Sequence, residues 1–295
     1  MISLSSHLKP FVLAVRRPLV AVVLLGLTTI TSQRAHAWNA VGHMTIAAIA
    51  ETRLNDNARR EVNKLLPLVA DPRSPDFMTA SVWMDDVRAD GVHLYNRWHY
   101  DNLGHSPDGT PIGPRHPDNV AWAIAQNVKT LKSEKVSNEE KARSLRFLLH
   151  TAQDAHNPLH CGSRFTKANP DGDSGGNEFL LKPENEASPG NLHALWDRAF
   201  GTFQSDNQPR LQSEGRLRAL ALSLTAKYPE ASLPQSTLLD PEMWVKEGGA
   251  LLNSGIYPLT STPDAAYMER FRPVAEKQAT LAGYRLAHLL NSIWP

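Results

Sequence analysis

The sequence predicts an all-α fold: one mostly helical domain with a short β-hairpin, preceded by an export signal. Apolar residues recur at helical spacing in several long segments, strand-like alternation is scarce, and neither a repeat nor a linker divides the 295 residues. At about 100–200 residues per domain, this length suits one large domain or two. The lack of a linker favours one domain, which is long enough to bury a sizeable core.

The first 37 residues have the features of a secretory signal peptide. A basic front precedes an apolar run at residues 19–30 that is too short to span a bilayer comfortably, and Ala35 and Ala37 supply the small residues that a signal peptidase requires. We therefore expect residues 1–37 to be removed, leaving residues 38–295 in a periplasm or outside the cell. An uncleaved membrane anchor is the alternative. No later apolar stretch is long enough to cross a membrane, so we expect no transmembrane segment in the mature chain.

Removing this segment makes the chain slightly acidic. It holds four of the 31 Lys and Arg residues and none of the 30 Asp and Glu residues, which leaves 27 basic against 30 acidic residues and a net charge of −3. A protein that holds nucleic acid by bulk charge is strongly basic, so a polyanionic substrate would have to be held by local charge. The single cysteine, Cys161, allows no internal disulfide and argues against a disulfide-stapled scaffold.

Helical spacing of apolar residues is clearest in residues 119–132, 137–158 and 277–294. The second of these segments opens with a capping box formed by Ser137 and Glu140, and we expect Pro158 to end that helix. Pro/Gly-rich composition predicts loops at residues 104–118 and 167–177. The best strand signal is NEFLLK at residues 177–182, which we interpret as half of the short hairpin.

Residues able to bind a metal are concentrated in two short motifs. His150 and Asp154 are i and i+4 on a predicted helix, so they project from one face a turn apart, and His160 follows closely. His193 and Asp197 repeat the i, i+4 spacing. One such pair is also typical of a surface ion pair or a packed histidine. Two pairs with a further histidine favour zinc or another first-row metal, because burying so many ionisable groups without one is costly.

Motifs along nearly the whole mature chain are similar to those of one known family. They are the Trp38 that cleavage would expose, VGH (41–43), WMDD (83–86), WHY (98–100), HTAQDAHNPLH (150–160), GGN (175–177), NLHALWD (191–197) and AGYRLAHLLN (282–291). In this combination the sequence resembles the S1/P1 nuclease family of zinc-dependent single-strand nucleases. The resemblance implies the phospholipase C/P1 nuclease-like helical fold.

The resemblance also implies three Zn²⁺ ions in one cleft. The first would be bound by the free terminal amine and carbonyl of Trp38 with His43, and Asp154 would bridge it to the second. The second would be completed by Asp85, His99 and His150, and the third would be held by His160, His193 and Asp197. An α-amine can ligate only when it is uncapped, so cleavage after Ala37 would be a step in building the site.

Several of these residues have other interpretations. Trp38 could simply pack in the core, since tryptophan is largely buried on average, and His99 lies in an aromatic run typical of a core. Asp86 is interpreted as a supporting or surface acid beside Asp85. His156 is interpreted in the same way beside His160. The histidines interpreted as non-ligands are His93, His105, His116 and His288.

The activity implied by the resemblance is hydrolysis of single-stranded DNA and RNA to 5′-phosphate products, with 3′-nucleotidase activity. Three carboxylate ligands and three zinc ions leave a local charge of +3 that would attract a phosphodiester. A metal-bridging water with its pKa lowered to about 7 would supply the attacking hydroxide.

Four residues have further implied roles around this reaction. Asp85 would also orient the nucleophile, and Arg88 would stabilise the transition-state charge, unless it is an ordinary surface arginine. Tyr100 would stack on an unpaired base, which explains a single-strand preference, and Asn102 would make a polar contact with the base.

Two other functions are open at this point. A zinc-dependent phospholipase C shares the helical trizinc architecture and the N-terminal tryptophan, although Tyr100 and the GGN motif favour nucleic acid. A non-catalytic exported zinc-binding protein would instead show flexible His-rich tracts, whereas these ligands lie on predicted helices. The expected partners are single-stranded DNA, RNA and 3′-nucleotides, and no stable protein partner is implied.

Overall fold

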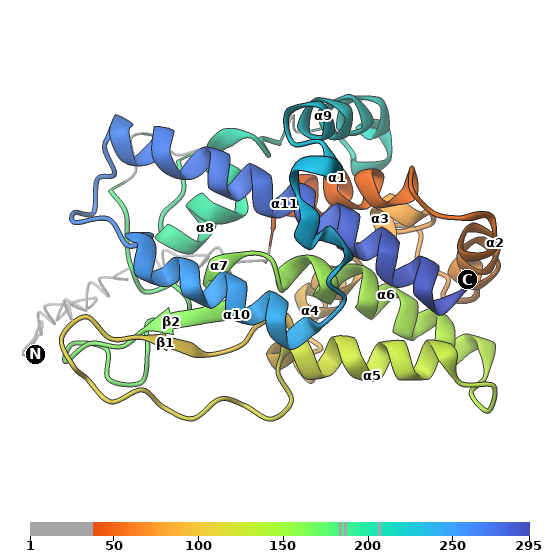
Figure 1. Cartoon of the computed structure of the whole chain (residues 1–295), viewed down its shortest axis with the longest axis horizontal. Coiled ribbons are helices and arrows are strands. Elements are labelled where there is room, and N and C mark those ends of the chain that lie inside the picture. The colour runs from red at the N-terminus through yellow and green to blue at the C-terminus, as the bar shows by residue number, and fades with distance from the viewer. Residues whose placement is uncertain (1–37, 183–184, 186–187, 206–207) are drawn as a thin grey trace, which may run out of the picture. The chain divides into compact units, whose positions relative to one another are not determined.

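The computed structural model describes residues 38–182, 185, 188–205 and 208–295, which are mostly helical (Figure 1). The described residues belong to one compact unit. The export signal expected in residues 1–37 lies outside them. The α-helices are α1 (Ala40–Glu51), α2 (Asp56–Leu65), α3 (Phe77–Ala80), α4 (Trp83–Ala89), α5 (Val120–Lys132), α6 (Asn138–Asp154), α7 (Pro158–Cys161), α8 (Leu192–Asp197), α9 (Glu214–Lys227), α10 (Pro241–Leu251) and α11 (Ala265–Ile293). The two strands are β1 (Leu103–His105) and β2 (Gly162–Arg164). The predicted fold class is confirmed.

Helices α1 and α6 each contain a continuous buried stretch. Every residue of α6 from Ser144 to Asp154 is buried, and so is every residue of α1 from Val41 to Ala50. A helix that is buried on all sides belongs to the core. α5 and α11 pack against α6, and α9 and α11 pack against α1 (Figure 1). The motif histidines on α1 and α6 are therefore carried into the interior.

The start of α6 lies where it was predicted, with the Ser137 half of the predicted capping box formed and the Glu140 side chain paired with Arg143, but the end of the helix differs. Ser137 caps the helix, and its side chain accepts a hydrogen bond from the Glu140 N–H at 3.2 Å. The helix ends at Asp154, whereas Pro158 is the first residue of α7. Asn157 caps α7 by accepting from the Leu159 N–H. Proline suits a first helical position because it has no N–H to leave unsatisfied there.

The other predicted helices are present, with one large shift in bounds. α5 follows its predicted segment and is capped by Asn119. α11 begins at Ala265, twelve residues before the predicted start, and continues through Pro273. Within the described residues, the helices are all too short or too polar to cross a membrane.

The predicted hairpin at residues 177–182 is wrong. The chain there forms turns with a single antiparallel bridge, from Leu180 to Asn191. The strands are instead β1 and β2, which pair in parallel with Leu103 opposite Gly162. A Cβ at Gly162 would lie 2.1 Å from the Leu103 carbonyl oxygen, so only glycine allows this approach. Local alternation could not reveal a pairing between segments so far apart.

Candidate metal centre

Eight ionisable side chains meet in the interior and are called here the histidine–aspartate cluster. Each is at most 4% exposed. They come from six segments: His43 (α1), Asp85 (α4), His99 (the 3₁₀ turn Asn96–His99), His150 and Asp154 (α6), His160 (α7), and His193 and Asp197 (α8). The structure thus brings together all the side chains that the resemblance implied as ligands.

The cluster contains three groups that could each hold a metal ion. They are His43, His150 and Asp154; Asp85, His99 and His150; and His160, His193 and Asp197, each with ligand atoms within 4.8 Å of one another. Asp154 Oδ1 lies 3.5 Å from His43 Nε2. Asp154 Oδ2 lies 3.2 Å from both His99 Nδ1 and His150 Nε2. Asp154 therefore faces two of the groups at once.

The hydrogen bonds of the histidines fix which nitrogen carries the proton. His150, His160 and His193 each place Nδ1 2.7 Å from a backbone carbonyl oxygen. A carbonyl can only accept, so Nδ1 carries a proton in all three, and Nε2 is the nitrogen that faces the cluster and can offer a lone pair to a metal. This is how proteins usually orient histidines that bind a metal.

These lone pairs face one another without a donor between them. His160 Nε2 lies 2.8 Å from His193 Nε2. His43 Nε2 and Asp154 Oδ1 are buried without a hydrogen-bond partner among the described residues. A cation placed between such acceptors would offset the cost of burying them unpaired. The donor set of imidazoles and carboxylates fits a divalent first-row metal such as zinc.

Burial sets the protonation states of the cluster. It lowers the pKa of His43 and of His193 to about 3, so both are neutral at pH 7, as a metal ligand must be. Burial also raises the pKa of Asp197 well above its usual value, which marks a carboxylate without enough positive charge nearby. At His150 burial is outweighed by Asp154 and Asp85, whose charges raise its pKa to about 9.

Trp38 lies beside this cluster and is fully buried. Its indole N–H donates to the Gln153 carbonyl at 3.1 Å, and its ring packs edge-on against Phe203. The next backbone N–H, that of Asn39, donates to the Asp197 carbonyl at 3.2 Å. The indole is thus packed in the core, and the chain at this residue is held between two segments of the cluster.

The GGN motif orients one histidine of the cluster. Ser174, Gly175 and Gly176 all have positive φ, and the Gly175 carbonyl accepts from His193 Nδ1 at 2.7 Å. A Cβ at Gly175 would lie 2.1 Å from the Leu159 carbonyl oxygen. Glycine is therefore required both by the backbone conformation and by the close packing.

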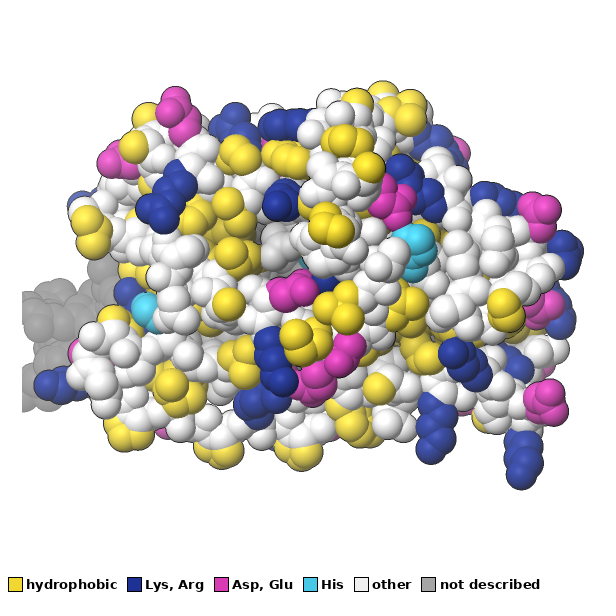
Figure 2. Space-filling model, viewed as in Figure 1, with side chains coloured by type: hydrophobic (Ala, Val, Ile, Leu, Met, Phe, Trp, Pro, Cys, Tyr) yellow, Lys and Arg dark blue, Asp and Glu magenta, His cyan; other side chains and the backbone are white. Residues whose placement is uncertain are grey.

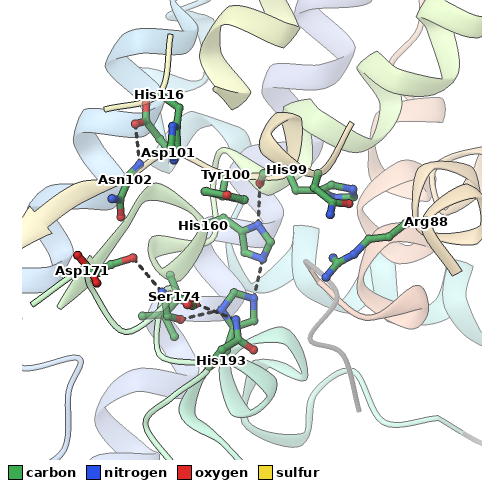
Figure 3. Close-up of a pocket in the computed structure, with 15 residues that line it drawn as sticks. Arg88, His99, Tyr100, Asp101, Asn102, His116, His160, Asp171, Ser174 and His193 are labelled. Carbon is green, nitrogen blue, oxygen red and sulfur yellow. Dashed lines mark hydrogen bonds between the residues drawn. The ribbon is translucent and has the colours of Figure 1, made fainter. Parts of the chain in front are cut away.

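A cleft of about 360 Å³ opens onto three histidines of the cluster, His99, His160 and His193. Figure 3 shows Arg88 reaching towards His160 and His193 from one side, with Tyr100 and Asn102 across the pocket. The positive charge of Arg88 adds to burial in lowering the pKa of His193. The three residues implied around the substrate thus line the same cleft.

The residues that were predicted not to bind a metal lie outside the three groups that could hold one. His116 lines the cleft with its ring 6.4 Å from that of Tyr100. His156 is buried against Arg285, while Asp86 forms an ion pair with Arg210. His93 is exposed, and the other two make their own hydrogen bonds, His105 to Asn253 and His288 to Glu230.

Sequence reasoning missed two supporting residues. Gln153 Oε1 lies 2.8 Å from His43 Nδ1, and Asn157 Nδ2 donates to Asp197 Oδ1 at 2.8 Å. Both stand inside the HTAQDAHNPLH motif, which was the available signal. The carbonyl of Ser81, which accepts from His150, had no such signal because any residue type supplies a carbonyl.

Comparison with known proteins gives the same family over the same residues. The model of the family described as S1/P1 Nuclease matches residues 38–295. The chain is 27% identical to Endonuclease 4 of Arabidopsis thaliana, over 88% of this chain and 90% of that protein. It is 22% identical to Nuclease S1 of Aspergillus oryzae (90% and 95%) and 23% identical to Nuclease P1 of Penicillium citrinum (87% and 97%). The chain therefore belongs to the S1/P1 nuclease family.

Proposed function

We propose that this protein is an exported, zinc-dependent nuclease that cleaves single-stranded DNA and RNA to 5′-phosphate products and removes 3′-phosphates from nucleotides. The observation that carries the proposal is the set of facing histidine lone pairs at the floor of the cleft, in a chain of this family. Figure 2 shows Lys and Arg side chains interspersed with Asp and Glu on the face drawn. Residues 38–295 carry 27 basic and 30 acidic side chains, so a polyanion would be attracted by the local charge of the loaded centre and not by bulk charge.

The proposed ligands of three zinc ions follow the three groups. Trp38, through its amine and carbonyl, would join His43 and Asp154, and Asp154 would be shared with the group of Asp85, His99 and His150. The third ion would be held by His160, His193 and Asp197. When bound, the ions supply positive charge and lower the pKa of water to about 7.

The chain's own side chains then orient the substrate. Asp85 lies in the cluster and would orient the attacking water, while Arg88 reaches into the cleft and would pair with the phosphate. Tyr100 would stack on an unpaired base, and Asn102 would contact its edge. Stacking requires a base that is out of its duplex, which accounts for the single-strand preference.

Export and cleavage after Ala37 are part of the same proposal. The family match begins at Trp38, whose indole N–H donates to the Gln153 carbonyl, and the N–H of the next residue, Asn39, donates to the Asp197 carbonyl. A terminal amine formed by cleavage would thus lie next to the cluster.

A single alanine added before Trp38 should abolish most of the activity, measured on single-stranded DNA with the N-terminus verified by intact mass. Full activity in that variant would contradict the ligand role of the amine.

The direct test is cleavage of single-stranded DNA and RNA by the mature protein before and after removal of metal. We expect about three zinc ions per chain by this ligand count, loss of cleavage on chelation, and recovery on adding zinc. Undiminished cleavage by metal-free protein would refute the proposal. Faster hydrolysis of phosphatidylcholine than of single-stranded DNA would assign the site to phospholipids instead.

A further inference from the structure

Gln153 contacts Trp38 and His43, two of the three residues that the proposed function places at the first metal ion. It is fully buried on α6, directly before Asp154. Its side-chain oxygen Oε1 lies 2.8 Å from His43 Nδ1, and its backbone carbonyl accepts the Trp38 indole N–H at 3.1 Å. Gln153 is therefore hydrogen-bonded to Trp38 and to His43, and it is the sequence neighbour of Asp154.

Folding stability alone does not explain this side chain. The amide nitrogen of Gln153 has no hydrogen-bond partner among the described residues, although it is buried. A buried donor left unsatisfied destabilises the folded state, whereas an apolar side chain of similar shape has no such penalty. The advantage of a glutamine here must lie in what its oxygen does.

That oxygen determines the tautomer of His43. By accepting from Nδ1–H it keeps the proton on Nδ1, so that Nε2 directs a lone pair towards Asp154 Oδ1, 3.5 Å away. The opposite tautomer would place a proton on Nε2 and block the ligand position. His150, His160 and His193 obtain the same orientation from backbone carbonyls, which belong to the main chain and not to a side chain. His43 depends on a side chain.

We propose that Gln153 is a positioning residue for the metal ion held by Trp38, His43 and Asp154, and that it sets the affinity of this ion separately from the other two. The inference rests on the proposed function in one respect, namely that an ion binds at this group. Glutamine at this position then acts through His43 and need not touch the substrate.

The test compares three variants of the mature, metal-loaded protein. Gln153→Met removes the acceptor with little change in volume, Gln153→Glu keeps an oxygen acceptor, and Thr151→Val removes another buried hydrogen bond of α6, from Thr151 to the Phe147 carbonyl. Zinc retained per chain is measured during titration with a chelator, and thermal unfolding is followed in parallel. Replacement by Co²⁺ gives a spectroscopic signature of the affected site.

We expect Gln153→Met to release one ion at a chelator concentration about 10–100-fold lower than the native protein, the usual effect of losing an outer hydrogen-bond partner of a ligand. The other two ions should be retained as in the native protein. Gln153→Glu should retain all three ions, including the first ion that Gln153→Met releases early. Thr151→Val should match the native titration.

Three results would overturn the inference. They are equal retention of all ions by Gln153→Met, loosening of all three ions together, and failure of Gln153→Glu to restore the first ion. Failure of the proposed function looks different. A native protein that binds three ions but cleaves no nucleic acid would refute the nuclease activity, while the chelator titration would still decide the role of Gln153.

Discussion

Two clusters of ionisable side chains each include buried histidines from residues 150–160, and their hydrogen bonding differs in kind. In the one called here the His156 cluster, His156 Nδ1 donates to the Ala152 carbonyl at 2.8 Å, and Nε2 accepts from Arg285 at 3.1 Å. Arg285 donates two further hydrogen bonds to Glu247, at 2.7 and 3.0 Å. Each donor named here meets an acceptor, so this cluster satisfies itself.

The histidine–aspartate cluster is arranged in the opposite way. Acceptors face acceptors, as at His160 and His193, and His43 Nε2 and Asp154 Oδ1 have no hydrogen-bond partner among the described residues. Both clusters hold buried histidines, and each draws one from α6 or the turn just after it, His150 in one cluster and His156 in the other. Burial and residue type therefore do not distinguish a metal centre from a structural network. The position of each proton does.

The largest expected effect follows from replacing the carboxylate that faces two groups. Asp154→Asn should lower kcat/KM on single-stranded DNA more than about 100-fold, beyond the 10–100-fold typical of losing an outer partner. The matching change in the His156 cluster, Glu247→Gln, should leave both metal content and kcat/KM unchanged. Steady-state kinetics at saturating zinc measure kcat/KM of the two variants, and metal analysis measures their metal content. Equal losses in the two variants would erase the distinction between the clusters.

Replacing one histidine in each cluster separates metal binding from stability. His160→Asn should lose one ion per chain and most of the activity. His156→Asn should keep its ions but lose about 1–3 kcal/mol of unfolding free energy, because Arg285 loses a buried acceptor. Metal analysis and urea unfolding of both variants provide the measurements. Loss of an ion from His156→Asn would contradict its assignment as structural.

Gly175, whose carbonyl orients His193, can be compared with Gly109, which also has a positive φ but has no atoms near its Cβ position. Gly109 has φ +79 and nothing near its Cβ position, so Gly109→Ala should cost about 1–2 kcal/mol of stability and leave metal binding intact. Gly175→Ala should also weaken the third ion about 10–100-fold, since the Gly175 carbonyl must move away from His193. Chelator titration distinguishes them, and equal metal retention in both would argue against the orienting role.

The smallest expected effect concerns pH. Burial, with a contribution from Arg285, lowers the pKa of His156 well below 6.5. Below about pH 6.5 the unfolded chain therefore binds a proton there that the folded chain does not, and stability is lost as the pH falls. Relative to His156→Gln, which does not titrate, the native protein should lose stability between pH 6.5 and 5 with a slope that rises to about 1.4 kcal/mol per pH unit. Urea unfolding of both proteins across this range measures the difference, and parallel curves would show that His156 is not held neutral.

Much of the local structure could be predicted from the sequence because its causes are local. The apolar spacing and caps of α5 and α6 are properties of consecutive residues, and so is the i, i+4 placement of His150 and Asp154. The end of α6 was missed because proline reads equally as a helix stop and as a first helical residue, and only the Asn157 cap decides between them.

The sequence by itself determined the helical class, the family and the candidate ligand residues, since these depend on spacing and on motifs that stand in single segments. Only the tertiary structure decided that β1 pairs with β2 and that the tautomers are set by carbonyls and Gln153. It also showed that His160 and His193 turn their lone pairs towards each other. These features join residues far apart in the chain, and any residue type can supply the backbone carbonyls on which most of them depend. No local pattern encodes such contacts.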